Sequence, residues 1–330
     1  MRRALAWPTA ALVVAVVAVL SLAVGTRAVP PATVFDALLH GGNSPDALVV
    51  RSLRLPRTEI GLTAGAALGL AGAALQAVTR NPLADPGILG LSQGAAAGVV
   101  LAIVLGGSAY GFGAYVWYAF TGAVLAACLV YGIASRGRGG ASPVKLALAG
   151  TALSAMTAGA TTVVLTSSSA TLDEFRFWQV GALSGRDAGT VVRMLPFLAV
   201  GAGLVLACAR GLDALALGDE TARALGHRVH VVRGCAALGA TLLTASAVAA
   251  AGPIAFVGLV VPHLARRVVR GGGYARVLPL SALLGAALLL AADVLGRVVR
   301  APAEVPAGVM TALVGVPVLV GLVRRKGAVA

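Results

Sequence analysis

The chain has 330 residues, of which 58% are hydrophobic and only 12% are charged, and its formal net charge is +14. A typical soluble domain is roughly 25% charged, so the composition excludes a water-soluble protein, and the high hydrophobic fraction excludes a disordered one. A positive net charge is also typical of nucleic-acid-binding proteins, but here the basic residues stand at the ends of apolar runs and form no single stripe. We therefore expect a polytopic protein of the lipid bilayer, with no nucleic-acid partner.

Apolar windows of about 20 residues, the length that crosses a bilayer as a helix, recur along the chain. They predict ten spans, near residues 8–25, 58–78, 88–107, 114–134, 144–166, 190–209, 231–252, 254–269, 277–296 and 306–323. The first span follows Met1-Arg2-Arg3, as in a signal peptide, but it is too apolar over too great a length for most signal peptides, so we expect it to stay uncleaved. Basic residues flank both termini, which predicts that both are cytoplasmic. The predicted fold is all-α, with about ten transmembrane helices, several of them short or broken.

Glycines recur at four-residue spacing in the second and third spans. They are Gly61, Gly65 and Gly69, followed by Gly90, Gly94 and Gly98. Small residues at this spacing let helices approach closely inside a bilayer, where packing drives association. We expect tightly packed helix interfaces at these positions, and glycines that line a pore are the alternative.

Three segments are too polar to be spans, and we expect them to belong to one membrane domain that covers residues 1–330. Two lie on the outer side, at about residues 26–57 and 167–187, and the third, at about residues 210–228, lies on the inner side. In the inner segment apolar residues alternate with charges at helical spacing, and Gly218 divides it into two short amphipathic helices. Such helices either lie along the membrane surface or dock into a groove of a partner protein.

The seventh and eighth spans are predicted from one long apolar run. The 34 residues from Val231 to Leu264 contain a single charge, Arg233. A straight helix of this length would be about 51 Å long, well beyond a hydrocarbon core of roughly 30 Å. Gly252-Pro253 is therefore predicted to break the run into two helices.

The chain has no phosphate-binding loop for a nucleotide. Its two lysines, Lys145 and Lys326, precede Leu146 and Gly327, so neither completes the pattern G-x-x-x-x-G-K-[ST]. If nucleotide hydrolysis drives this protein, another polypeptide carries it out.

Five motifs resemble one family in order and spacing over nearly the whole chain. They are "RLPR" (54–57), "GAALGLAGAALQAVTRNPLADPGILGLSQGAA" (65–96), "LALGDETARALG" (215–226), "GPIAFVGLVVPHLARR" (252–267), and "PLSALLGAALLLAADVLGR" followed by "EVPAGVMTALVG" (279–315). On these motifs the chain resembles the permease subunits of the iron-siderophore, haem and cobalamin class of ABC importers, which is the FecCD type. The resemblance implies a ten-span permease, without enzymatic activity of its own, in the bacterial cytoplasmic membrane.

The resemblance also implies the partners. A second permease, either another copy or a paralogue, would pair with this chain and leave the translocation path between them. Two cytoplasmic ABC ATPase subunits would bind below, and an extracytoplasmic substrate-binding protein would dock above. The permease would bind no cofactor and no metal, because ATP and Mg belong to the ATPase.

Three groups of residues match functional positions of the family. Docking of the binding protein is implied for Arg54, Arg57 and Arg297, and an arginine fork suits pairing with carboxylates. Without the resemblance, Arg54 and Arg57 would be read as side chains at a span end, and Arg297 as an i,i+4 partner of Asp293.

An inner gate is implied for Asn81 and Leu83, although Pro82 also predicts a turn that ends the helix. The second gate of the family would fall at 142–145, where this sequence departs from the pattern. Coupling to the ATPase is implied for Leu212, Leu215, Ala216, Leu217, Gly218, Asp219, Glu220, Ala222, Arg223, Leu225 and Gly226.

We therefore expect the permease of an ATP-driven importer of a metal chelate, with a ferric siderophore as the first candidate cargo and haem or cobalamin as the alternative. Asp293 lies in an apolar run, and an ionisable residue there also suits an ion-coupled secondary transporter. An integral-membrane enzyme is the third class, but the spans contain no cluster of polar residues for it. His227 and His230 have the spacing of a metal pair but no third ligand nearby, so no metal site is expected.

Overall fold

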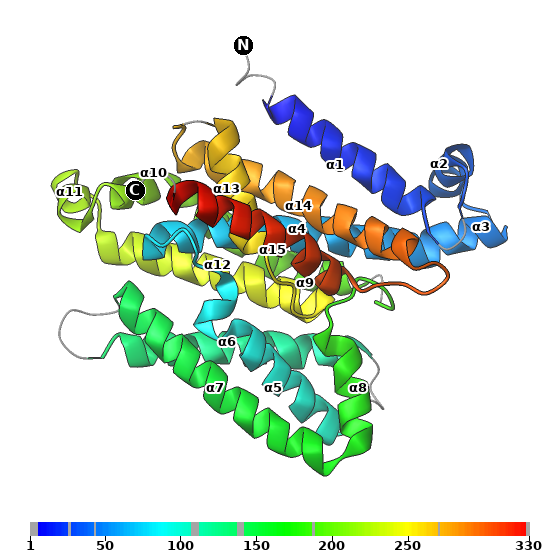
Figure 1. The fold of residues 1–330 in the computed structure, drawn as a ribbon, viewed down its shortest axis with the longest axis horizontal. Helices are drawn as coiled ribbons and strands as arrows, with labels where there is room; N and C mark the ends of the chain where they lie inside the picture. The colour runs from blue at the N-terminus through cyan, green and yellow to red at the C-terminus, as the bar shows by residue number, and fades with distance from the viewer. Residues whose placement is uncertain are drawn as a thin grey trace.

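The computed structural model describes residues 6–25, 28–42, 44–106, 112–136, 142–186, 189–269 and 271–327. Within these residues the chain is helical, with turns between the helices and no strand (Figure 1). Met1 to Arg3, the basic start of the first predicted span, lie outside the described residues, as do residues 26, 27, 43 and 187 of the predicted outer segments. The all-α prediction is confirmed for the described part of the chain.

The described residues form fifteen α-helices, with a π-helical segment (η1) and a 3₁₀ turn (η2) among them. In chain order they are α1 (Ala6–Ala23), α2 (Pro31–Leu39), α3 (Pro45–Leu48), η1 (Val49–Arg54), α4 (Leu55–Thr79), η2 (Pro86–Leu89), α5 (Leu91–Val104), α6 (Phe112–Ala134), α7 (Pro143–Ser167), α8 (Ser169–Gln179), α9 (Gly189–Ala207), α10 (Ala209–Ala216), α11 (Asp219–Ala224), α12 (Val229–Ala251), α13 (Val257–Val269), α14 (Tyr274–Val299) and α15 (Ala307–Gly327).

Seven helical stretches in the described residues are long and apolar enough to cross a membrane. They are α1, the continuous run Pro45–Thr79, α6, α7, α9, α12 and α14. The other three predicted spans coincide with α5, α13 and α15, of which α5 and the part Ala307–Gly321 of α15 are shorter apolar helices. A multi-pass membrane protein is therefore confirmed, whereas the count of ten spans stays a prediction.

The run Pro45–Thr79 extends well beyond the second predicted span. Its 35 residues rise about 52 Å, against a hydrocarbon core of roughly 30 Å. The last part of the predicted outer segment is thus a helical continuation of α4, and it carries the arginines of the RLPR motif.

The glycines at four-residue spacing let helix backbones touch. A Cβ on Gly65 of α4 would lie 2.5 Å from the carbonyl oxygen of Gly285 on α14, and a Cβ on Gly94 of α5 would lie 2.5 Å from that of Gly122 on α6. These distances confirm the predicted tight interfaces. Gly90 differs from the rest of the series, because it has φ +74° and ends the η2 turn.

The apolar run of the seventh and eighth spans breaks where predicted. Helix α12 ends at Ala251, Gly252 has φ +79°, and α13 begins at Val257. Gly218, with φ +117°, likewise separates α10 from α11, as predicted.

Two groups of helices meet along α12. Figure 1 shows α5, α6, α7 and α8 on one side and α1, α13, α14 and α15 on the other. Helix α4 is buried along most of its length between α12, α13 and α14. The short helices α10 and α11 lie at one end of the bundle, and α2, α3 and α8 lie at the opposite end (Figure 1). We refer to these as the α10 end and the α8 end.

Candidate functional sites at the two ends of the bundle

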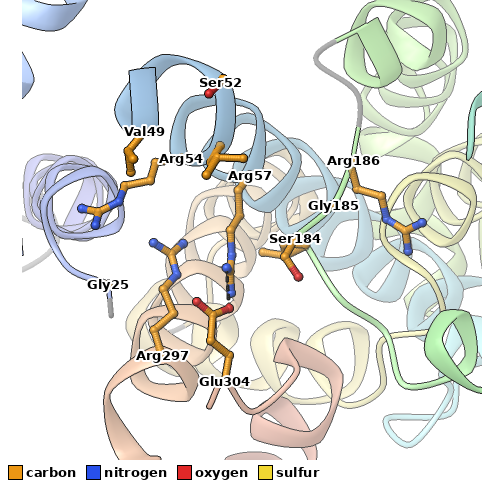
Figure 2. A pocket seen from close by; sticks show the side chains of 12 residues that line it. Gly25, Val49, Ser52, Arg54, Arg57, Ser184, Gly185, Arg186, Arg297 and Glu304 are labelled. Carbon is orange, nitrogen blue, oxygen red and sulfur yellow. Dashed lines mark hydrogen bonds and ion pairs between the residues drawn. The ribbon is translucent and has the colours of Figure 1, made fainter. Parts of the chain in front are cut away.

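Five charged side chains gather at the α8 end, where the end of η1, the start of α4, the end of α14 and the segment before α15 meet. Figure 2 shows Arg54, Arg57, Arg297 and Glu304. We call Arg54, Arg57, Asp293, Arg297 and Glu304 the arginine cluster. Its three arginines are those for which docking is implied by the resemblance. The structure combines them with two carboxylates from the last quarter of the chain.

Asp293 lies at the centre of the cluster. Its side chain is fully buried and accepts hydrogen bonds from Arg57 Nη2 at 2.8 Å, Arg57 Nε at 3.0 Å and Arg297 Nε at 3.0 Å. The predicted i,i+4 ion pair between Asp293 and Arg297 is therefore confirmed. Because the pair is buried, both partners depend on each other for compensation of their charge.

Arg54 and Arg297 turn toward the end of α1 instead of the solvent. Arg54 Nη1 donates to the carbonyl oxygens of Leu22 and Ala23 at 2.8 and 2.7 Å, and Arg297 Nη1 donates to those of Ser21 and Val24 at 2.7 and 3.1 Å. The last four carbonyls of a helix have no partner within the helix, and cations near them are favourable. The two arginines are 6% and 2% exposed. They therefore fasten α1 to α4 and α14, and neither extends into solvent as a side chain at a span end would.

Arg57 and Glu304 form the more accessible part of the cluster. Arg57 Nη1 lies 2.7 Å from Glu304 Oε2, and the two side chains are 11% and 33% exposed. Both line a cavity of about 280 Å³, as does Arg186, which Figure 2 shows apart from the other arginines. Burial lowers the pKa of Arg186 to about 10, so it remains protonated at neutral pH. The cavity thus presents a positive surface to an incoming carboxylate.

Arg186 and Glu304 were not singled out as site residues by the sequence. Arg186 lies in the polar segment 167–187, and Glu304 lies in the EVPAG part of a motif. Neither has a sequence spacing that relates it to Arg57. The ion pair between Arg57 and Glu304, for example, joins residues 247 positions apart.

The predicted coupling segment forms α10 and α11, which we call the coupling helices. Its residues differ in exposure, and Gly218 and Asp219 are intermediate. Leu212, Leu215 and Ala222 are at most 1% exposed and pack into the core. The exposed residues are Ala216, Leu217, Glu220, Arg223, Leu225 and Gly226, which we call the coupling surface. Leu212, Leu215 and Ala222 are covered by this chain itself, so their predicted part in coupling can only be to hold the coupling helices in place.

Asp219 joins the coupling helices to two long helices. Its carboxylate pairs with Arg80, which follows the end of α4, and with Arg233 of α12 at 3.1 Å. Arg80 Nε also donates to the carbonyl oxygen of Leu215 at 3.0 Å. A displacement of α11 would therefore pull on both α4 and α12.

Asp213 joins α10 to a third long helix. Its Oδ1 accepts a hydrogen bond from the backbone N–H of Tyr274 at 2.7 Å, at the first residue of α14. A carboxylate at this position satisfies an N–H without an intrahelical partner and is favourable to the helix dipole.

Asn81 and Leu83 lie in the turn that follows α4. Arg80 has φ +50°, and the backbone N–H of Leu83 donates to Asn81 Oδ1 at 2.9 Å, so the predicted helix-terminating turn is confirmed. Both residues are exposed at the α10 end. Ser142, at the second expected gate, caps α7 by accepting from the backbone N–H of Lys145. Neither observation tests a gate.

The described residues hold no group of three His, Cys, Asp or Glu side chains that could bind a metal ion. His227 and His230 lie on either side of the start of α12, which begins at Val229.

Comparisons with known proteins match one family over almost the whole chain. The model of the FecCD transport family matches residues 12–325. The chain is 44% identical over 328 residues to the ferric enterobactin transport system permease protein FepD of Escherichia coli (strain K12), covering 98% of this chain and 96% of that protein. It is 42% identical over 311 residues to the Fe(3+)-citrate import system permease protein YfmD of Bacillus subtilis (strain 168), covering 93% and 90%.

Two further similarities concern cargo and fold. The chain is 40% identical over 279 residues to the cobalamin import system permease protein BtuC of Halobacterium salinarum, covering 84% of this chain and 74% of that protein. The fold is similar to a solved metal-chelate type ABC transporter in an inward-facing conformation, with a TM-score of 0.84, 27% identity, and coverage of 96% and 98%.

Proposed function

The chain belongs to the FecCD transport family, and we propose that it is the membrane permease of an ATP-driven importer that carries a ferric siderophore into a bacterial cell. Similarity over almost the whole chain to permeases named for ferric enterobactin and ferric citrate carries this proposal. The relative named for cobalamin import supports cobalamin as the second candidate cargo.

We propose the following assembly. Two permeases pair, two cytoplasmic ABC ATPases bind at the α10 end and hydrolyse ATP with Mg, and an extracytoplasmic binding protein docks at the α8 end. This orientation places both termini in the cytoplasm and uses ten spans, with α5, α13 and α15 completing the seven long ones. The basic residues near the ends of the apolar runs support it.

The proposed mechanism uses the ties between the coupling helices and the long helices. When ATP closes the ATPase dimer, the coupling helices move with it and displace α4, α12 and α14 through Arg80, Arg233 and Asp213. Packed helices switch between discrete arrangements, so this motion opens the path on one side as it closes on the other. Nucleotide supplies the differential free energy, and this chain performs no chemical step.

The α8 end is the proposed docking site of the binding protein. Arg57 is the proposed direct contact, because its only accessible partner within the arginine cluster is Glu304, whereas Arg54 and Arg297, which also line the cavity, are held by the carbonyls at the end of α1. An acidic side chain of the binding protein would replace Glu304 on Arg57. Arg54 and Arg297, which hold α1, would add to the positive electrostatic potential at Arg57 without contacting the binding protein.

Two substitutions with opposite expected effects test the docking proposal. Arg57→Gln should weaken the affinity of the binding protein for the purified transporter, whereas Glu304→Gln should strengthen it, because it frees Arg57 from an internal competitor. Surface plasmon resonance at two salt concentrations measures the dissociation constant of the binding protein for the wild type and for each variant. Equal affinities for all three proteins would refute docking at Arg57.

The coupling surface is the proposed contact with the ATPase. Leu217→Asp together with Leu225→Asp places charges on side chains that are 66% and 60% exposed, so folding should persist while co-purification of the ATPase is lost. Leu215→Asp is unsuitable for this purpose because Leu215 is buried. Normal co-purification with the Leu217 and Leu225 variant would contradict the assignment.

Asn81 and Leu83 are the proposed inner gate. Both are exposed where α4 ends beside Arg80, which is tied to the coupling helices. Leu83→Ala should raise leakage of a small chelate through transporter reconstituted without ATP, compared with Val268→Ala, at an exposed position of α13, as a control. Identical leakage from the two variants would remove Leu83 from the gate.

Uptake by the complete transporter tests the function itself. In proteoliposomes, uptake of a radioactive ferric siderophore should require ATP, the ATPase and the binding protein, and should survive an uncoupler. Uptake that survives loss of the ATPase but collapses with an uncoupler would instead support a secondary transporter that uses Asp293. Uptake of cobalamin alone would support the second candidate cargo.

A further inference from the structure

An apolar groove lies between α6 and α12 near the α10 end, away from the arginine cluster. Its volume is about 380 Å³. Its lining is uncharged and mostly aliphatic or glycine, and it comes from α4 (Leu75, Val78, Thr79), α6 (Val124, Ala127, Cys128, Val130, Tyr131, Gly132), α7 (Leu146) and α12 (Gly234, Ala237, Leu238, Thr241, Leu242). The groove therefore separates the α5–α8 group of helices from the rest of the bundle at this end.

The groove has the length of one lipid leaflet. It extends from Val124 to Gly132 along α6 and from Gly234 to Leu242 along α12, a rise of about 12 Å on each helix. Half of a hydrocarbon core is roughly 15 Å thick. An acyl chain that enters from the membrane surface at the α10 end would therefore be covered over most of its depth.

The mouth of the groove opens beside apolar surface. Tyr131 and Leu238, which line it, are 44% and 53% exposed, and Leu125 and Leu129 on the outer face of α6 are 63% and 55% exposed. Such a surface is compatible with lipid and not with water.

Basic residues lie next to lining residues of the groove near the α10 end. Lys145 precedes Leu146 of the lining, and its Nζ donates to the carbonyl oxygen of Arg136, one turn beyond Gly132. Arg233 precedes Gly234 on the opposite wall and pairs with Asp219. Basic pockets between membrane helices at this depth suit anionic lipid head groups.

We propose that this groove binds an acyl chain of an anionic phospholipid of the leaflet at the α10 end, with its phosphate between Arg136 and Lys145. The bound lipid fills the space between α6 and α12 and bridges the two groups of helices. The inference requires only that the chain lies in a bilayer, so it does not depend on the cargo or on the docking site.

Native mass spectrometry of the complete transporter tests the proposal, with phosphatidylglycerol and phosphatidylcholine of equal chain length as probes. The wild type should retain phosphatidylglycerol in preference. Arg136→Gln with Lys145→Gln should lower this retention by about fivefold for each cation removed, or about 25-fold for both. The matched control is Arg267→Gln with Arg276→Gln, which removes two exposed cations at the same end outside the groove.

A second variant tests the acyl site separately from the head group. Gly132→Leu adds a side chain to the groove at a position where a Cβ has nothing within 4 Å, and should abolish retention of both lipids. Gly203→Leu on α9 is its control, because a Cβ there also has open space but lies outside the groove. If Gly132→Leu fails to fold, the glutamine variant still decides the question.

Three results would overturn the proposal. They are equal retention of the two lipids by the wild type, unchanged retention in the glutamine variant, and unchanged lipid retention in Gly132→Leu combined with loss of the permease pair. The last result would show that the groove receives a second copy of this chain.

Discussion

Asp293→Asn is expected to destabilise the permease strongly although it changes only one atom of the side chain. Asp293 is fully buried and compensates Arg297, which is 2% exposed, and Arg57, whose side chain is 11% exposed. Removing one partner of a buried pair costs about 3–5 kcal/mol, because the remaining charge stays buried and uncompensated. The melting temperature should therefore fall by about 10 °C.

Glu304→Gln is the matched control. It removes the same charge from the second acidic partner of Arg57, but the Glu304 side chain is 33% exposed. Exposed ion pairs contribute about 0–1 kcal/mol, so this variant should melt within about 3 °C of the wild type. Because both variants remove one negative charge, the difference between their melting temperatures reports the effect of burial.

Thermal unfolding of the purified complex in detergent, followed by intrinsic fluorescence, measures both variants. A double variant, Asp293→Asn with Arg297→Gln, should recover part of the lost stability, because the buried cation disappears with its partner. Similar melting temperatures for Asp293→Asn and Glu304→Gln would refute the reasoning, since burial of Asp293 would then have no energetic consequence.

Two further predictions concern the packing of α4 and its tie to the coupling helices. Gly65→Ala should lower the free energy of unfolding by about 1–3 kcal/mol, because its Cβ would lie 2.5 Å from the Gly285 carbonyl oxygen. Gly203→Ala is the control: a Cβ there meets nothing within 4 Å, so this variant should be neutral or stabilising in the same unfolding assay. Asp219→Asn should leave stability within about 1 kcal/mol, since its partners are partly exposed, but should reduce the stimulation of ATPase activity by the loaded binding protein; full stimulation would contradict the role of Asp219 in transmission.

Much of the fold was predictable because hydropathy and backbone chemistry are local. Each predicted span coincides with a helix, and the breaks at Gly252 and Gly218 lie where glycine adopts positive φ. The glycine spacing likewise predicted the contact between α4 and α14, since close approach in a bilayer requires small residues on one face. Even the Asp293–Arg297 pair was predictable from i,i+4 spacing alone.

Tertiary structure alone decided which side chains face a partner. Leu212 and Leu217 look alike in an amphipathic pattern, but packing against α12 and α14 covers the first and leaves the second exposed. Arg54, Arg57 and Arg297 are alike in charge and all line the open cavity, but the carbonyls at the end of α1 hold Arg54 and Arg297, whereas Arg57 pairs with the partly exposed Glu304. A sequence specifies composition and periodicity, whereas partners 236 or 247 residues away, as for Arg57, are set by how the helices pack.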